Sequence, residues 1–311
     1  MHVSVVQMKL EADNIVSLDL RRADGGDLPP WSPGAHVDVV LKSGLVRQYS
    51  LCGTPADLSA YRIAVLREAA GRGGSREIHD SLRLGDVVEL RGPRNHFALG
   101  AAERYVFIAG GIGITPILPM IEEVAARNAA WSLFYFGRTA GTMAFRQMLG
   151  RHGGHVAILP DDRPHGIGLD RIIWAAQGAD IYCCGPAGLI QAVESRCAEA
   201  GIADRCHVER FAPVAPPAEA ETGEAFTAVI ASTGQEIAVP ADRSLLHCLL
   251  DHGVDVLFSC EEGMCGSCEV RVLDGQPLHR DAVLNDKEKA QGDRLMVCVS
   301  RARSKRLVLK L

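Results

Sequence analysis

Hydrophobic positions in the first hundred residues fall in short runs separated by turn residues. The runs are Val3–Val6, Ile15–Leu20, His36–Leu41, Tyr61–Val65 and Asp86–Leu90. Proline and glycine interrupt them at Pro29-Pro30, Pro33-Gly34, Ser43-Gly44 and Gly71–Gly74. Short strands with turn signals between them are typical of an antiparallel barrel or sandwich. Residues 1–100 are therefore predicted to form an antiparallel β-barrel domain.

The pattern changes after residue 100, where continuous apolar strands alternate with helical periodicity. The expected strands are Tyr105–Ala109, Trp131–Phe136, Val156–Leu159 and Ile181–Cys184. The expected helices are Leu118–Arg127, with Pro116 near its first turn, and Leu189–Ala200. Such alternation indicates a doubly wound parallel sheet with helices on both faces. We assign residues 101–212 to this α/β domain.

A stretch rich in Pro, Ala and Glu follows and has no periodicity, which predicts a semi-extended linker over residues 213–225. Beyond it, strand-like runs at Phe226–Ala231 and Glu236–Pro240 precede a helix at Ser244–His252, with Ser244 as its N-cap. Residues 226–311 are expected to form a third domain.

Composition narrows the class of protein. A chain of 311 residues with 47% hydrophobic and 23% charged residues is ordinary for a globular protein of two or three domains. A net charge of −5 gives no reason to expect a nucleic acid partner. The longest uncharged stretch, Tyr105–Ile121, is shorter than the about 20 apolar residues of a membrane helix and contains Gly and Pro, so no membrane association is expected. Ten cysteines without an export signal favour a reducing compartment, the cytoplasm.

Four of those cysteines carry the most specific chemistry in the chain. Three follow the spacing C-x4-C-x2-C and a fourth lies far along the sequence: Cys260, Cys265, Cys268 and Cys298. This is the ligand pattern of a plant-type [2Fe–2S] cluster. Gly263 and Gly266 stand where a loop around a cluster needs positive φ or close backbone approach.

The same four cysteines have two other interpretations. Zinc sites favour paired C-x2-C units, and Cys298 has no cysteine close to it in sequence. Four unrelated buried thiols would show no such spacing. Next to the loop, Glu261 and Glu262 either steer a basic partner or form a solvated loop face.

Two motifs in the barrel segment suggest a flavin site. In Arg47-Gln48-Tyr49-Ser50 an arginine can clamp a phosphate, a tyrosine can pack on an isoalloxazine ring, and a serine hydroxyl can bond a flavin nitrogen. In Gly71-Arg72-Gly73-Gly74-Ser75 the glycines let backbone N–H groups approach a phosphate, and Ser75 would cap the following helix. A surface Arg47, a core Tyr49 and a mobile glycine loop are equally compatible with these spacings.

The middle segment carries two further motifs at strand ends. Gly110-Gly111-Ile112-Gly113-Ile114-Thr115-Pro116 lies between a strand and a helix, where helix N–H groups can hold a pyrophosphate. It does not meet the full G-x-G-x-x-G pattern, and a tight structural turn is its alternative. Cys184-Gly185-Pro186 closes another strand. There Cys184 is either a small buried residue or a neighbour of a nicotinamide.

In this order the motifs resemble those of the phthalate dioxygenase reductase family, the reductase components of two-component oxygenases. The resemblance spans the chain and rests on Arg47-x-Tyr49-Ser50, Gly73-Gly74-Ser75, Gly110–Pro116, Cys184-Gly185-Pro186 and the four cysteines. It implies a flavin-binding barrel, an NADH-binding α/β domain and a C-terminal β-grasp ferredoxin domain.

The resemblance also implies cofactors and site residues. It implies FMN rather than FAD, and Arg76 after the glycine loop fits a loop that ends on a terminal phosphate. Residues implied to contact FMN are Arg47, Tyr49 and Ser50, with Ser50 near N5, and the glycine loop Gly73, Gly74 and Ser75. Residues implied to bind the nicotinamide nucleotide are Gly110, Gly111, Gly113, Thr115, Pro116, Cys184, Gly185 and Pro186, with Thr115 and Cys184 flanking the nicotinamide.

Two residues stay ambiguous. Phe211 lies close to the flavin or belongs to the core, and Arg138 is a candidate 2′-phosphate binder that would imply NADPH, where the resemblance implies NADH.

The expected reaction is hydride transfer from NADH to FMN, followed by single-electron steps to the cluster and then to a terminal oxygenase, of the Rieske type and acting on an aromatic acid or a related compound. A flavin between the two centres is needed because it accepts two electrons and releases them singly. The alternatives are a redox sensor or electron carrier without NADH turnover, and a self-contained oxygenase. No Rieske pair, facial triad or haem-thiolate signature supports the last of these. The oxygenase, its substrate and the oligomeric state are not predicted.

Overall fold

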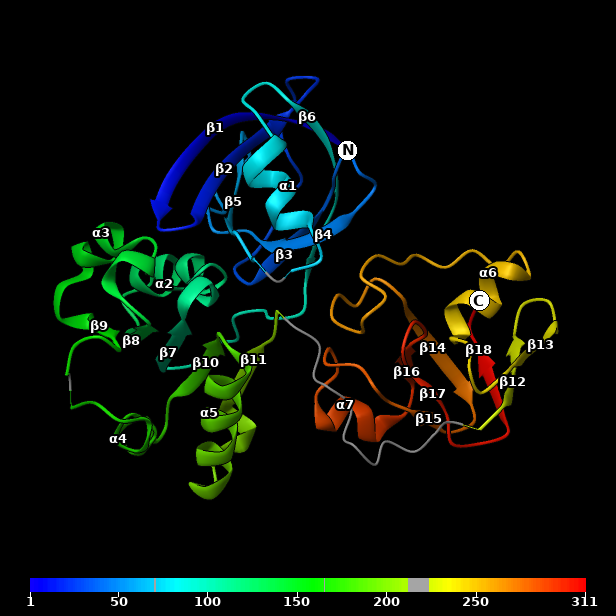
Figure 1. The fold of residues 1–311 in the computed structure, drawn as a ribbon. Coiled ribbons are helices and arrows are strands. Elements are labelled where there is room, and N and C mark those ends of the chain that lie inside the picture. Colours follow the sequence, from blue (N-terminus) through cyan, green and yellow to red (C-terminus); the bar gives the residue numbers. More distant parts are fainter. Residues whose placement is uncertain (70, 165, 212–223) are drawn as a thin grey trace. The chain divides into compact units, whose positions relative to one another are not determined.

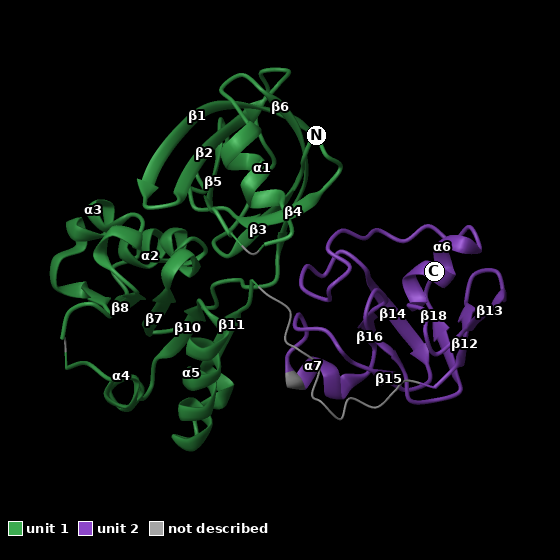
Figure 2. Ribbon diagram, viewed as in Figure 1, with its two compact units in different colours: residues 1–211 green, residues 212–311 purple. Residues whose placement is uncertain are grey.

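The computed structural model describes residues 1–69, 71–164, 166–211 and 224–311 (Figure 1). The chain forms two compact units, residues 1–211 and 212–311 (Figure 2). The expected linker at 213–225 lies outside the described residues except for its last two. Within the described ranges no helix is long and apolar enough to cross a membrane.

The first unit begins with a six-stranded sheet in the order β4-β3-β6-β1-β2-β5, in which all pairs are antiparallel. Its elements are β1 (His2–Ala12), β2 (Ile15–Arg22), β3 (Ala35–Val40), β4 (Val46–Ser50), β5 (Tyr61–Leu66), α1 (Gly74–Ser81) and β6 (Val87–Asn95). All five predicted hydrophobic runs form strands. Alternate residues such as Val37, Val39 and Ile63 fill the core of this sheet, together with Ile78 of α1.

The sheet closes into a barrel directly after β4. Leu51 forms an antiparallel bridge with Ile63 of β5. The N–H of Leu51 donates to the carbonyl of Ala35 at 2.8 Å, and that of Cys52 donates to the carbonyl of Arg62 at 2.8 Å. Closure therefore fixes the end of β4, where Ser50 stands.

The rest of the first unit contains a five-stranded sheet in the order β11-β10-β7-β8-β9, and every pair in it is parallel. Its elements are β7 (Arg104–Gly110), α2 (Ile117–Ala126), β8 (Ala130–Gly137), α3 (Arg146–Leu149), β9 (Val156–Pro160), α4 (Leu169–Ala175), β10 (Asp180–Cys184), α5 (Ala187–Glu199) and β11 (Cys206–Glu209). Successive strands run outward from β7 on one side and from β10 on the other. The strand order therefore reverses between β7 and β10, which confirms the doubly wound prediction.

The second unit contains a five-stranded mixed sheet in the order β13-β12-β18-β14-β16 and a small pair, β15-β17. Its elements are β12 (Phe226–Ile230), β13 (Glu236–Val239), α6 (Leu245–Asp251), β14 (Glu269–Asp274), β15 (Pro277–Leu278), α7 (Asp286–Gln291), β16 (Arg294–Met296), β17 (Arg301–Ala302) and β18 (Arg306–Leu309). Ser244 caps α6 as predicted, because its hydroxyl accepts the N–H of His247 at 3.2 Å. Four leucine and cysteine side chains of α6 join the apolar core beneath it.

Candidate redox sites

The two strand-end motifs of the α/β segment meet at the reversal of the parallel sheet. Ala109 of β7 lies opposite Cys184 of β10, so the loops that follow both strands leave the sheet side by side. A methyl group on Gly113 would lie 2.5 Å from the carbonyl carbon of Cys184, and one on Gly110 would lie 2.6 Å from Cδ of Pro186. Only glycine permits this approach. The crevice beyond the carboxyl ends of the strands at such a reversal is where open α/β sheets bind ligands.

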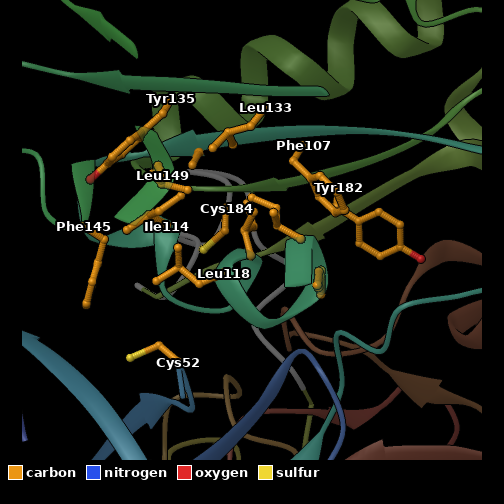
Figure 3. Close-up of a cluster of buried hydrophobic side chains, with 14 of the residues drawn as sticks. Cys52, Phe107, Ile114, Leu118, Leu133, Tyr135, Phe145, Leu149, Tyr182 and Cys184 are labelled. Atoms are coloured by element: carbon orange, nitrogen blue, oxygen red, sulfur yellow. The ribbon is translucent and has the colours of Figure 1, made fainter. Parts of the chain in front are cut away.

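The side chains at this position are buried and uncharged. Thr115 and Cys184 are buried, and the Thr115 hydroxyl donates to the carbonyl of Ile112 at 3.0 Å. Burial raises the pKa of the Cys184 thiol well above its ordinary value, which keeps it a neutral thiol. Figure 3 shows Cys184 next to Ile114, and Cys52 from the barrel belongs to the same buried cluster. The barrel therefore contributes to the apolar surroundings of the strand ends.

Glu209 completes this group, and no sequence motif pointed to it. The last residue of β11, it pairs in register with Cys184. The Ser50 hydroxyl hydrogen-bonds its carboxyl group, and one carboxyl oxygen is buried without a protein partner. Burial outweighs that hydrogen bond and raises the pKa of Glu209 to about 8. Ser50, Cys184 and Glu209, from three separate stretches of sequence, thus meet at one point.

The two candidate phosphate-binding motifs of the barrel also lie together. The Arg47 guanidinium donates to the carbonyl of Arg72 at 2.8 Å and to that of Val46 at 2.8 Å. A methyl group on Gly74 would lie 2.5 Å from Cγ of Arg47. The arginine therefore lies directly on the glycine loop, where an anion bound by loop N–H groups would also meet its positive charge.

The predicted cap of α1 is wrong. The helix begins at Gly74, and its N-cap is Gly73, whose φ of 88° is a conformation that glycine tolerates best. This conformation starts the helix earlier than expected and places Ser75 inside it. The Ser75 hydroxyl instead accepts the N–H of Glu68 at 3.1 Å. Ser75 therefore ties the first turn of α1 to Glu68, two residues after the end of β5.

The aromatic candidates have different surroundings. Tyr49 is half-buried against the barrel core, and burial raises the pKa of its hydroxyl group. Phe211 is 46% exposed, so the core interpretation of that residue is wrong. The exposed ring follows Glu209 by two residues and is available to a ligand.

The four cysteines of the second unit form two close pairs. The sulfurs of Cys268 and Cys298 are 3.2 Å apart, and the thiols of Cys260 and Cys265 are hydrogen-bonded to each other. In each pair the neighbouring thiol shifts one pKa downward, to about 5 for Cys265 and below the ordinary value for Cys268. The lowered pKa of one cysteine in each pair favours the thiolate, the form that binds metal.

Backbone N–H groups of the loop point at these sulfurs. Cys260 accepts from Glu262 at 3.3 Å and from Met264 at 3.5 Å, while Cys265 accepts from Ser267 at 3.3 Å. The loop reaches this shape because Gly263 and Gly266 have φ of 67° and 69°, as predicted. Two thiol pairs with N–H donors fit a cluster of two irons, each of which takes two cysteine sulfurs.

A buried carboxylate, which the sequence did not reveal, supports the cysteine loop. Asp281 accepts the N–H of Leu284 at 2.8 Å and the hydroxyl of Ser300 at 3.2 Å. The next N–H, of Ala282, donates to the carbonyl of Gly263 at 2.9 Å. These bonds join the cysteine loop to the segment that follows Cys298, so the fourth cysteine is held in place against the other three.

Known proteins resemble this chain along its whole length. Residues 228–303 match the family described as the 2Fe-2S iron-sulfur cluster binding domain. The chain is 45% identical to a vanillate O-demethylase oxidoreductase from a Pseudomonas species, over 99% of each chain. It is 40% identical to the phenoxybenzoate dioxygenase subunit beta of Ectopseudomonas oleovorans, over 96% of this chain and 94% of the relative.

A solved structure shares the complete architecture. It is phthalate dioxygenase reductase, described as a modular structure for electron transfer from pyridine nucleotides to [2Fe–2S]. The TM-score is 0.70 at 35% identity, over 100% of this chain and 98% of the other. The flavin-type barrel, the α/β sheet and the C-terminal iron–sulfur domain are therefore a shared arrangement.

Proposed function

The chain belongs to the phthalate dioxygenase reductase family of NADH-dependent flavin and iron–sulfur oxidoreductases, and from this premise we propose that it is the reductase component of a two-component oxygenase. In this role it takes a hydride from NADH and delivers single electrons to a terminal oxygenase. The observation that carries the proposal is the convergence of Ser50, Cys184 and Glu209 at the sheet reversal, in a chain that also pairs four cysteines. The flavin supplies the conversion of two-electron into one-electron chemistry, and the cluster carries single electrons.

The barrel residues would hold FMN. Arg47 and the glycine loop Gly73, Gly74 and Ser75 offer one guanidinium and several N–H groups to a terminal phosphate. Tyr49, on the same strand, would pack on the ring, and Ser50 would face its N5. A single phosphate suits this small loop, which favours FMN over FAD.

The buried neutral groups would control the charge around the reacting ring. With a pKa of about 8, Glu209 is mostly protonated at neutral pH, and the Cys184 thiol is neutral. Neither group then repels a ring that gains negative charge, and the Glu209 carboxyl can donate a proton through Ser50. Gly110, Gly111, Gly113, Thr115, Pro116, Gly185 and Pro186 form the loops that would position the nicotinamide, with Phe211 at the exposed margin.

The surroundings of Arg138 favour NADH over NADPH. Arg138 follows β8, and its carbonyl accepts the N–H of Asp162, while that of Gly137 accepts the N–H of Asp161. Two exposed acidic residues, Asp161 and Asp162, are therefore joined by backbone bonds to the turn that contains the arginine. They oppose a 2′-phosphate and suit a ribose hydroxyl.

In the second unit Cys260, Cys265, Cys268 and Cys298 would bind the [2Fe–2S] cluster. The partner we propose is a Rieske-type oxygenase that acts on an aromatic acid or a related compound, because the similar chains belong to vanillate and phenoxybenzoate systems. All ten cysteines are free thiols, in keeping with our proposal of a cytoplasmic protein.

An anaerobic NADH titration followed by visible absorption tests this function. We expect bleaching of both flavin and iron–sulfur bands, with about three electrons taken up per chain, because the flavin accepts two and the cluster one. If both chromophores are present and neither bleaches, the reductase function is refuted and the sensor or carrier alternative takes its place.

A further inference from the structure

Two exposed apolar side chains lie directly before the cysteine loop. Leu257 is 84% exposed and Phe258 is 36% exposed. Both stand in a segment without helix or strand, but Val254 and Val256 on the same segment pack against the core of the second unit. Val254 and Val256 therefore attach the segment to the core, while Leu257 and Phe258 are exposed to solvent. We call these two residues the apolar pair.

The apolar pair lies at the accessible side of the four thiols. Cys260 is half-buried, whereas Cys265, Cys268 and Cys298 are buried. Leu257 precedes Cys260 by three residues, so their Cα atoms are at most about 11 Å apart. An electron that leaves through the accessible cysteine therefore emerges next to this apolar surface.

The charged residues that neighbour the apolar pair in sequence are all acidic. Between residues 254 and 270 the chain has four carboxylates, Asp255, Glu261, Glu262 and Glu269, and neither lysine nor arginine. Asp255 and Glu261 are exposed. The Nε2 atom of His247 lies 3.2 Å from a carboxyl oxygen of Glu261, a contact that holds the Glu261 side chain on the loop. An apolar centre with an acidic margin complements an apolar patch ringed by lysine and arginine.

We propose that Leu257 and Phe258 are the centre of the docking surface for the electron-accepting oxygenase, with Asp255 and Glu261 on its margin. This inference rests on the proposed function. The occupant is a basic protein acceptor that binds and leaves, because two apolar side chains bury far less area than a permanent subunit interface. Burial of the apolar pair against the acceptor would hold the acceptor's redox centre close to Cys260. The carboxylates would increase the rate at which the two proteins meet.

The test uses the purified holoprotein and a defined acceptor. The protein is reduced anaerobically with dithionite, excess reductant is removed, and the protein is mixed with cytochrome c, a basic protein that accepts one electron. For Leu257→Ser we expect the second-order rate constant to fall roughly tenfold, because the acceptor would no longer bury an apolar side chain at this position. For Glu261→Gln we expect a several-fold fall at low salt that disappears at high salt. The iron–sulfur spectrum should be unchanged in both variants.

The matched control is Leu273→Ser. Leu273 is 56% exposed on β14 of the same unit, five residues beyond Cys268, and this variant should react with cytochrome c like the unaltered protein. An unaltered rate in Leu257→Ser would overturn the proposal. So would a variant that keeps its rate with cytochrome c but accepts electrons more slowly from its own flavin, because the apolar pair would then serve a contact within the chain.

Failure of the proposed function would be distinguishable from failure of this proposal. In that case NADH would not reduce the unaltered protein, whereas dithionite would still do so. The comparison of Leu257→Ser with Leu273→Ser would then decide the docking surface by itself.

Discussion

The site at the sheet reversal and the cysteine loop are built in opposite ways. At the sheet reversal, Ser50, Cys184 and Glu209 come from three distant stretches and meet only because strands pair in register. In the second unit, three of four cysteines lie within nine residues on one loop shaped by two glycines. The first site depends on topology and close backbone packing, and the second on local sequence. Substitutions should therefore damage them independently.

The largest expected effect is the loss of any paired cysteine. Replacing Cys260, Cys265, Cys268 or Cys298 with Ser should abolish NADH-dependent cytochrome c reduction, because the cluster loses a thiolate ligand. Ferricyanide reduction by the flavin should remain, since the first unit is untouched. Cys248→Ser is the matched control, a buried cysteine of α6 outside the two pairs. Retained cytochrome c activity in all four variants would refute the ligand assignment.

Gly113→Ala should damage the site at the sheet reversal and leave the cysteine loop intact. The added methyl group would collide with the Cys184 carbonyl, so one of the two loops must move by roughly 1 Å. Misplacement of that size costs on the order of 100-fold in a positioned reaction, and we expect this loss in flavin reduction by NADH in stopped flow.

Gly188→Ala is its control, because a methyl group there meets nothing within 4 Å. The dithionite-reduced cluster of Gly113→Ala should still react normally with cytochrome c. A parallel loss in that reaction would mean that the two sites are not independent.

A third test separates flavin binding from hydride transfer. Arg47→Ala removes the guanidinium that lies on the glycine loop, so the FMN dissociation constant should rise by roughly 10- to 100-fold, the value of one or two charge-assisted bonds. Fluorescence of released flavin during dialysis measures this. Arg91→Ala is the control, since Arg91 is an exposed barrel residue paired with Glu89. Full flavin occupancy in Arg47→Ala would exclude its phosphate role.

The last test concerns pH and measures stability rather than electron transfer. The pKa of Glu209 is raised from 4.5 to about 8 in the folded protein, so the folded state holds this proton more tightly than the unfolded chain. The free energy of unfolding should therefore fall as pH rises from about 5 to about 8, by at most on the order of 1 kcal/mol per pH unit. Glu209→Gln should flatten this dependence in denaturant titrations. An identical slope in both proteins would show that Glu209 is not buried as an acid.

The contrast between the sites also explains what the sequence could predict. The shape of the cysteine loop was predictable, because the cysteine spacing and the two positive-φ glycines are local properties. The glycine motifs of the α/β segment were predictable as turns, but their meeting depends on the pairing of β7 with β10. Glu209 could not be predicted as a site residue, because β11 has only four residues, Cys-His-Val-Glu, and two of them are polar. Its burial exists only once β11 pairs with β10.

The structure differs from the sequence-based prediction at two further positions, and both differences have local physical causes. Helix α1 begins earlier than predicted, because Gly73, with its positive φ, is the N-cap in place of Ser75. Asp281 gave no periodic signal, since its role is to accept backbone N–H groups in a segment between elements. Carboxylates of this kind become visible only when the folded backbone shows which N–H groups lack a partner.

The bridge between Leu51 and Ile63 has a consequence for the tolerance of the barrel to change in length. The bridge and the backbone bonds of Leu51 and Cys52 hold the end of β4 in place, independently of the residues that follow. Residues 53–60, beyond these bonds, form an excursion in which no residue is buried. Insertions and deletions there should leave Ser50 where it is, which makes this hairpin the place to graft an affinity tag or a fluorescent reporter without disturbing the residues proposed to hold FMN.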